Sequence, residues 1–275
     1  MSGMRPKPPT LRRRPGAHTD AVSANRVARP VSALANSYPR GHVIAAHRHP
    51  RAQLIFGLDG VMTVHAAGSM WTVPASHALW MPPGVEHQVH MASAVEMRSI
   101  YFDPRVLRGT PRECQVLFVS PLLRELIVRA VEIAPLYDER GRDGRVMRLI
   151  VDEVATLRPE PLSLRMPGDP RLARLCERLL ADLSATRSVE AMGRRVGLSG
   201  RSVMRLFPAE TGLTFGRWQQ QARLLKAFAL FDQGLGVTQV ALELGYSSPA
   251  AFTKMFRRLL GAPPRAILAR QASNP

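Results

Sequence analysis

A short helix with sharp start and stop signals lies near the C-terminal end, and it constrains the fold more than any other segment. Either Ser247 or Ser248 can cap this helix, and Pro249 can take its first position, where a missing N–H costs nothing. Gly261 then ends it. Its apolar residues recur at three- and four-residue spacing: Phe252, Met255, Phe256 and Leu259. Since an apolar helical stretch at 237–244 and a glycine turn precede it, the segment predicts a helix-turn-helix, whose second helix fits the DNA major groove.

The same pattern occurs once more upstream, within residues 188–207. Residues 188–195 are typical of a short helix, 196–199 of a turn, and 201–207 of a second helix that Ser199 can cap. Residues 215–231 are long enough to form a rigid helix between the two copies. Two such units in one chain can reach two successive faces of the major groove, roughly 34 Å apart.

Two stretches carry a resemblance to a known family. They read SVEAMGRRVGLSGRSVMRLFPAETGLTFGRW in the first copy and VTQVALELGYSSPAAFTKMFRRLLGAPP in the second. Residues 171–268 thereby resemble the DNA-binding domain of AraC/XylS-type bacterial transcription regulators. The resemblance implies an all-α domain that binds double-stranded DNA, with RNA polymerase as a further partner. Pro208 departs from the family pattern; because a proline inside a helix costs about 3 kcal/mol, it predicts a first recognition helix that is shorter than usual.

The net charge of +17 is concentrated at the two ends of the chain. Residues 1–30 carry a net charge of +6, residues 31–164 of +1, and residues 165–275 of +10. A cationic region that contains helix-turn-helix patterns is typical of a protein that binds the phosphate backbone. The sequence has no apolar run long enough to span a membrane and no secretory signal, and its two cysteines fit a reducing compartment. We therefore expect a cytoplasmic, nucleoid-associated protein without membrane contact.

The N-terminal part changes from a basic tail to a β-rich region. Residues 1–30 are rich in proline and arginine and predict a disordered basic tail. Residues 31–103 contain short β-type runs broken by glycine and proline, with hairpin signals at Asp59-Gly60 and Ala67-Gly68. So many short strands in this length predict a small barrel or jelly roll.

Helical periodicity follows in residues 104–158. Apolar residues recur on one face of this segment, Leu122 and Leu149 among them. The face could pack against the barrel of the same chain, or it could form the homodimer interface, since relatives dimerise through this region. Residues 159–170 are rich in proline and glycine and predict a linker to the DNA-binding domain, residues 171–275.

Two histidine motifs lie within the β-rich region. The first reads Gly-x5-His-x-His-x3-Gln-x6-Gly over residues 41–60, and the second reads Pro-Pro-Gly-x2-His over residues 82–87. Both resemble the cupin motifs, although a glutamine replaces the glutamate of the first motif, and the second lacks its leading glycine and trailing asparagine. The resemblance implies a cupin-like barrel in which four side chains converge: His47, His49, Gln53 and His87.

These four side chains suit either a metal site or a metal-free effector pocket. Two histidines at i and i+2 on a strand point to the same face, and three imidazoles with an amide can hold Zn²⁺, Ni²⁺ or Fe²⁺. Glutamine in place of the carboxylate removes a negative charge and weakens the case for redox-active iron. Without a metal, the same groups would hydrogen-bond an effector or each other. Candidate walls of the pocket are Met62, Trp71, Trp80, Met81 and Met97.

The family resemblance also implies which residues face DNA bases. In the first recognition helix they are Arg201, Met204 and Arg205, with Ser202 nearby. In the second they are Ser248, Pro249, Ala250, Ala251 and Lys254. Arginine pairs with guanine through two hydrogen bonds, so we expect Arg201 and Arg205 to read sequence; their other role would be to bind phosphate. The small side chains of the second helix predict little reading by hydrogen bonds.

The sequence therefore predicts an α+β multidomain protein: an N-terminal cupin-like β-barrel, a helical dimerisation segment and an all-α C-terminal domain with helix-turn-helix units at 188–207 and 237–258. We expect a non-enzymatic, sequence-specific transcription regulator in which a small effector changes how a homodimer engages DNA. A cupin metalloenzyme with a DNA-binding appendage and an effector-independent DNA-binding protein are the alternatives. Residues 69–91 and 94–102 also resemble a subgroup that includes a repressor of a 2-nitroimidazole exporter, which implies control of an efflux or catabolic gene.

Overall fold

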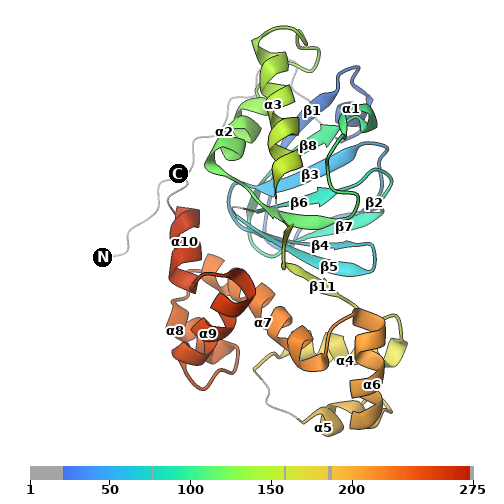
Figure 1. Ribbon diagram of the computed structural model, residues 1–275, viewed down its shortest axis with the longest axis vertical. Helices are drawn as coiled ribbons and strands as arrows, with labels where there is room; N and C mark the ends of the chain where they lie inside the picture. The colour runs from blue at the N-terminus through green and yellow to red at the C-terminus, as the bar shows by residue number, and fades with distance from the viewer. Residues whose placement is uncertain (1–20, 76, 158, 185–187, 273–275) are drawn as a thin grey trace.

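The computed structural model describes residues 21–75, 77–157, 159–184 and 188–272, which form two domains (Figure 1). The N-terminal domain contains two β-sheets with helices against one of them, and the C-terminal domain consists of helices only. The expected α+β architecture with two parts is therefore confirmed. Within these residues, no helix is both long enough and apolar enough to cross a membrane.

The β domain is built from two antiparallel sheets that lie face to face. The six-stranded sheet has the order β1-β8-β3-β6-β9-β10, and the five-stranded sheet has the order β11-β5-β4-β7-β2. This double sheet is the arrangement of a jelly roll. The strands are β1 (Val31–Tyr38), β2 (Val43–His47), β3 (Ala52–Gly57), β4 (Val61–Ala66), β5 (Ser69–Pro74), β6 (His77–Met81), β7 (His87–Met91), β8 (Val95–Phe102), β9 (Gln115–Phe118), β10 (Pro159–Glu160) and β11 (Ser163–Arg165).

Strand β3 shows how the sheet separates two cores. Gln53 and Ile55 face the space between the sheets, where they line a pocket. Leu54 and Phe56 point the other way, into a second apolar core beneath the helices. Because both faces of β3 are buried, its sequence is a nearly continuous apolar run rather than an alternation.

Helices α2 (Pro121–Ala130) and α3 (Arg142–Thr156) cover the outer face of the six-stranded sheet (Figure 1). Their buried residues are Leu123, Ile127, Ala130, Gly144, Met147, Ile150 and Val154. The helical segment thus packs against its own β domain, which was one of the two expected roles. Leu122 and Leu149, two residues of the predicted apolar face, do not take part in this packing and are 51% and 39% exposed.

Of the two predicted hairpin turns, the structure has one and lacks the other. Ala67 and Gly68 join the paired strands β4 and β5, and both have positive φ values, 50° and 67°, as a tight hairpin requires. The hairpin prediction at Asp59-Gly60 is wrong, because the chain there crosses from β3 in one sheet to β4 in the other. A Cβ on Gly60 would lie 2.2 Å from the carbonyl oxygen of Ala94, so this crossing needs a glycine.

The predicted basic tail of residues 1–30 is only partly described. Residues 1–20 lie outside the described residues. Within 21–30 the tail prediction is wrong, because helix α1 (Ala21–Arg26) places Ala24 in a small core with Leu34 and Tyr101. Arg51 also donates hydrogen bonds to the carbonyl oxygens of residues 27 and 29, at 2.7 and 2.9 Å.

The predicted linker at 159–170 is wrong in its first half. Strand β10 pairs with β9, and β11 pairs with β5, so the segment completes both sheets. Leu162 and Leu164 are fully buried. Both strands lie at sheet edges, and an edge strand tolerates the proline residues that made the segment resemble a linker. Residues 104–158, predicted to be helical, also contain a short 3-10 helix (Pro104–Val106) and strand β9.

The C-terminal domain contains two helix-turn-helix units that share one long helix, α7 (Figure 1). The aromatic ring of Phe207 packs on Trp218, with centroids 5.6 Å apart, and Phe256 packs on Phe228 at 5.8 Å. Both second helices are therefore held against α7. The helices are α4 (Pro170–Ala181), α5 (Val189–Arg194), α6 (Gly200–Thr211), α7 (Phe215–Asp232), α8 (Val237–Glu243), α9 (Pro249–Leu260) and α10 (Pro264–Ala272).

Pro208 does not shorten the first recognition helix, so that expectation is wrong. Helix α6 continues through Pro208 to Thr211. Pro208 begins the last turn of the helix, where it removes one backbone hydrogen bond. The last turn is secured by other bonds: Gly212 donates its N–H to the Pro208 carbonyl at 2.8 Å, and the Thr211 hydroxyl donates to the Phe207 carbonyl at 2.8 Å.

Candidate functional site

The first candidate surface is the exposed side of α6. Arg201, Met204 and Arg205 are all exposed, whereas Val203 and Phe207 are fully buried on the other side. The exposed side thus carries two guanidinium groups, which can bond guanine edges or phosphates. It also carries the Met204 side chain, 50% exposed, which can meet a thymine methyl.

Ser202 also takes part in the cap at the start of α6. The hydroxyl of Ser199 accepts a hydrogen bond from the N–H of Ser202 at 3.0 Å, and the two hydroxyls lie 2.9 Å apart. Ser202 is therefore engaged in capping α6. The preceding turn is tight, since a Cβ on Gly193 would lie 2.6 Å from the carbonyl oxygen of Leu198. These contacts fix the angle at which α6 leaves α5.

The second candidate surface is the N-terminal half of α9. The hydroxyl of Ser248 accepts a hydrogen bond from the N–H of Ala251 at 3.2 Å, so Ser248 caps the helix. The expected contact residues after the cap are all exposed: Pro249, Ala250, Ala251 and Lys254. Arg257, which the sequence also places off the apolar face of this helix, is exposed one turn beyond Lys254 on the same side.

Inside the β domain, the three motif histidines come together. His47 ends β2 and His87 begins β7, and the two are direct partners across the strands, with ring centroids 4.2 Å apart. His49 follows in the next loop and is 8% exposed. One ring nitrogen from each of the three residues lies within 4.8 Å of the other two. The cluster is therefore close enough to bind one metal ion.

Main-chain carbonyls fix the protonation of all three rings. The Nδ1 atoms of His47, His49 and His87 lie 2.9, 2.7 and 3.0 Å from the carbonyl oxygens of residues 45, 51 and 85. Because a carbonyl only accepts, each Nδ1 donates its proton to the carbonyl oxygen, so that in the neutral ring the lone pair lies on Nε2. Ring orientation of this kind, set by backbone carbonyls, is typical of metal-binding histidines.

The Nε2 atoms are the ring nitrogens of the cluster that do not contact these carbonyls. Nε2 of His87 is buried and, among the described residues, has no hydrogen-bond partner. Burial lowers the pKa of His87 to about 4, so its ring is neutral near pH 7 and able to bind a cation. Nε2 of His49 lies 2.9 Å from Oε1 of Gln53. If the ring is neutral, both atoms carry lone pairs; a cation between them, a turned Gln53 amide or a second proton on the ring would each make the contact favourable.

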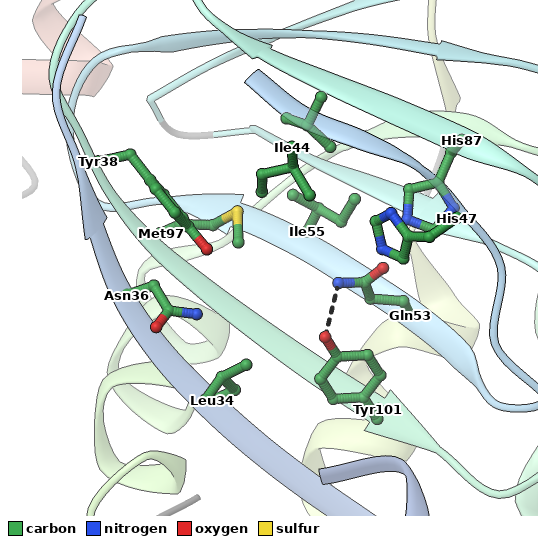
Figure 2. A pocket seen from close by; sticks show the side chains of 11 residues that line it. Leu34, Asn36, Tyr38, Ile44, His47, Gln53, Ile55, His87, Met97 and Tyr101 are labelled. Carbon is green, nitrogen blue, oxygen red and sulfur yellow. Dashed lines mark hydrogen bonds between the residues drawn. The ribbon is translucent and has the colours of Figure 1, made fainter. Parts of the chain in front are cut away.

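A pocket of about 210 Å³ opens beside this cluster, between the two sheets (Figure 2). Gln53 lies in its wall beside His47, and its amide donates to the hydroxyls of Ser99 at 2.9 Å and Tyr101 at 3.2 Å. Burial raises the pKa of Tyr101 to about 12, so its hydroxyl keeps its proton. The lining residues are Leu34, Asn36, Tyr38, Ile44, His47, Gln53, Ile55, His87, Val89, Met97 and Tyr101.

Of the five predicted wall residues, only Met97 lines this pocket. Met62 and Met81 are buried in the core between the sheets. Trp80 points to the opposite core, and its indole N–H donates to the carbonyl of residue 111 at 2.7 Å. Trp71 lines a separate cavity, whose walls also include residues of the C-terminal domain.

Known proteins match both domains of this chain. A family model described as an AraC-like ligand binding domain matches residues 29–196, and one described as a helix-turn-helix domain matches residues 192–270. The chain is similar to the HTH-type transcriptional regulator NimR of Escherichia coli (strain K12), with 32% identity over 229 residues, which is 82% of each chain.

Two solved structures are also similar. The DNA-binding domain of AdpA in complex with a target DNA is 32% identical, and the match covers 38% of this chain and 96% of that one with a TM-score of 0.36. ToxT from Vibrio cholerae is 9% identical, with 88% of this chain and 99% of that one covered and a TM-score of 0.38. Since both TM-scores are low, membership of a family is decided by the sequence matches.

Proposed function

This chain belongs to the AraC family of DNA-binding transcription regulators, and from that premise we propose that it binds a specific operator through α6 and α9 under the control of a small effector. The observation that carries the proposal is the pair of capped, exposed recognition helices on one shared helix, joined to a β domain with an internal pocket. The relatives are regulators, and we propose that the β domain senses rather than catalyses. Control requires that the effector bind one arrangement of the protein more tightly than another.

The chain is proposed to act as a homodimer in the cytoplasm. Leu122, Leu149 and Leu136 supply exposed apolar surface on and between α2 and α3, at 51%, 39% and 66% exposure. Helices that already cover their own sheet leave this outer side free for a second copy. RNA polymerase is a further proposed partner. The resemblance of residues 69–91 to one regulator subgroup supports an efflux or catabolic gene as target.

Binding of the purified protein to its own upstream intergenic region tests the proposal. We expect one fragment to be bound tightly in excess competitor DNA, with two chains per fragment, and the affinity to fall as salt rises because phosphate contacts release counterions. An effector-independent DNA-binding protein would keep the same affinity with every candidate effector. Uniform binding of all fragments would mean that only the basic surface acts and would contradict sequence-specific recognition.

We further propose that His47, His49 and His87 hold one divalent cation, with the Gln53 amide beside it. The support is the common Nδ1 bonding to backbone carbonyls, the close approach of the three rings, and the buried Nε2 of His87. A bound cation would offer the effector a positive ligand at the edge of the pocket. Three nitrogen ligands without a carboxylate suit Zn²⁺ or Ni²⁺.

His47→Ala is expected to reduce Zn²⁺ or Co²⁺ affinity by more than about 100-fold, since even the outer partners of metal ligands contribute about 10–100-fold. His65→Ala is the matched control, because His65 is an exposed histidine of β4 outside the cluster. Metal titration with elemental analysis measures both variants, and Co²⁺ absorption reports the nitrogen ligands. Equal metal content in the wild type and both variants would contradict the site.

A further inference from the structure

A second cavity lies where the two domains meet, and neither the DNA-binding surfaces nor the histidine cluster uses it. Its volume is about 650 Å³. The β domain contributes Trp71, Arg112, Glu113 and Arg165 to its walls, and the C-terminal domain contributes Leu213 and Gln221. The cavity therefore lies beside β11, the strand that runs between the β domain and α7 (Figure 1).

The chemistry of this cleft favours a negatively charged ligand. The side chains of Arg112 and Arg165 are exposed, and within the described residues neither is paired with a carboxylate. Glu113 supplies one negative charge against these two positive charges. The indole of Trp71, half-buried in the same wall, offers a flat apolar surface. Guanidinium groups bind carboxylates through two parallel hydrogen bonds, and an aromatic face accepts a planar ring.

Size also distinguishes the cleft from the pocket between the sheets. Sites for small organic molecules usually have volumes of about 300–1,000 Å³ and prefer domain interfaces. The interdomain cleft, at about 650 Å³, lies within this range. The pocket beside the histidines is smaller, at about 210 Å³.

The cleft is built on the contacts that fasten the DNA-binding domain to the β domain. The indole N–H of Trp218 in α7 donates to the carbonyl oxygen of Arg165 at 2.8 Å. The Gln221 amide donates to the carbonyl oxygens of Pro161 at 3.2 Å and Ser163 at 2.5 Å. A ligand in the cleft would thus touch the same short strand that orients both helix-turn-helix units.

We propose that this interdomain cleft binds a small aromatic carboxylate, with Arg112 and Arg165 on the carboxylate and Trp71 against the ring, and that binding changes operator affinity. The site is distinct from the proposed histidine site. It acts by favouring one orientation of the C-terminal domain on β11, since a ligand shifts only the equilibrium between states that it binds unequally.

Benzoate and benzamide, which differ chiefly in charge, are the probes. The chain has three tryptophans, of which Trp80 and Trp218 are fully buried and Trp71 is not, so indole N–H signals in NMR spectra separate the sites. Trp71→Phe assigns its signal. We expect benzoate to shift the Trp71 signal saturably and benzamide to bind at least about tenfold more weakly.

Arg165→Gln is expected to weaken benzoate binding at least about tenfold. Its fold is expected to persist, because Trp218 binds the main-chain carbonyl and not the side chain of Arg165. Arg108→Gln, an exposed arginine outside the cleft, is the matched control. His47→Ala should leave benzoate binding unchanged, which separates this site from the histidine cluster.

Three results would overturn the proposal. They are equal binding of benzoate and benzamide, wild-type benzoate affinity in Arg165→Gln, and no saturable Trp71 shift. Operator titrations with saturating benzoate then test regulation: we expect at least a threefold change in the wild type and none in Arg165→Gln. Binding at Trp71 without any change in operator affinity would overturn the regulatory role while leaving operator recognition itself intact.

Discussion

Replacing Gly245 with alanine is expected to lower the free energy of unfolding of the C-terminal domain by about 3 kcal/mol. Gly245 lies in the turn between α8 and α9 with φ of +75°, a conformation that costs an alanine about 1–2 kcal/mol. In addition, a Cβ there would lie 2.5 Å from the carbonyl oxygen of Ser184. Overpacking of this kind typically costs about 1–3 kcal/mol more.

The two segments cannot easily move apart, because Arg223 holds them together. Its Nε–H lies 3.1 Å from the carbonyl oxygen of Leu183 and 3.0 Å from that of Leu244. These two residues are the immediate neighbours of Ser184 and Gly245. If the two segments moved apart to relieve the added contact, the hydrogen bonds of the half-buried Arg223 guanidinium would weaken. This raises the free-energy cost of the substitution.

Gly234→Ala is the matched control for this prediction. Gly234 also has positive φ, +87°, but a Cβ there would meet nothing within 4 Å. We expect it to cost only the backbone term of about 1–2 kcal/mol. Urea unfolding of the full chain, followed by far-UV circular dichroism, compares the two variants. Equal unfolding midpoints would show that the approach of Ser184 does not constrain the turn.

The C-terminal domain could be predicted from sequence because local signals determine it. Ser199 and Ser248 cap the two recognition helices, and residues at three- and four-residue spacing form their buried sides. The error at Pro208 shows the limit of this reasoning. Local propensity disfavours a proline inside a helix, but packing of Phe207 and the bonds around Gly212 outweigh the single hydrogen bond that Pro208 removes.

In the β domain, the sequence predicted only the features that short sequence motifs carry. The resemblance to the cupin motifs implied the convergence of His47, His49 and His87, whereas the pairing of β11 with β5 joins residues nearly a hundred positions apart. No local pattern encodes such a register. For the same reason the sequence placed Trp71 in the inner pocket, whereas Trp71 lines the separate cleft between the domains.

Arg201→Ala and Arg205→Ala are each expected to weaken operator binding by about 1–3 kcal/mol, which is about 5- to 150-fold. Both guanidinium groups lie on the exposed side of α6, and the backbone of that helix is fixed by the Ser199 cap and the buried Phe207. Neither side chain is needed for the core, so the variants should unfold at the wild-type midpoint. Operator titrations at several salt concentrations measure the effect.

Titrations across a salt series distinguish two roles of an arginine, base reading and phosphate binding, which an affinity at one salt concentration does not distinguish. Removal of an arginine that reads guanine should relax the preference at one base pair, so that the variant binds every base pair at that position alike. Removal of an arginine that contacts only phosphate should weaken the binding of specific and nonspecific DNA alike. It should also lower the slope of log affinity against log salt concentration by about 1. Arg108→Ala removes the same charge from the β domain and should change neither quantity. If Arg201→Ala and Arg205→Ala both behave as Arg108→Ala does, α6 does not contact the operator, and recognition must depend on α9.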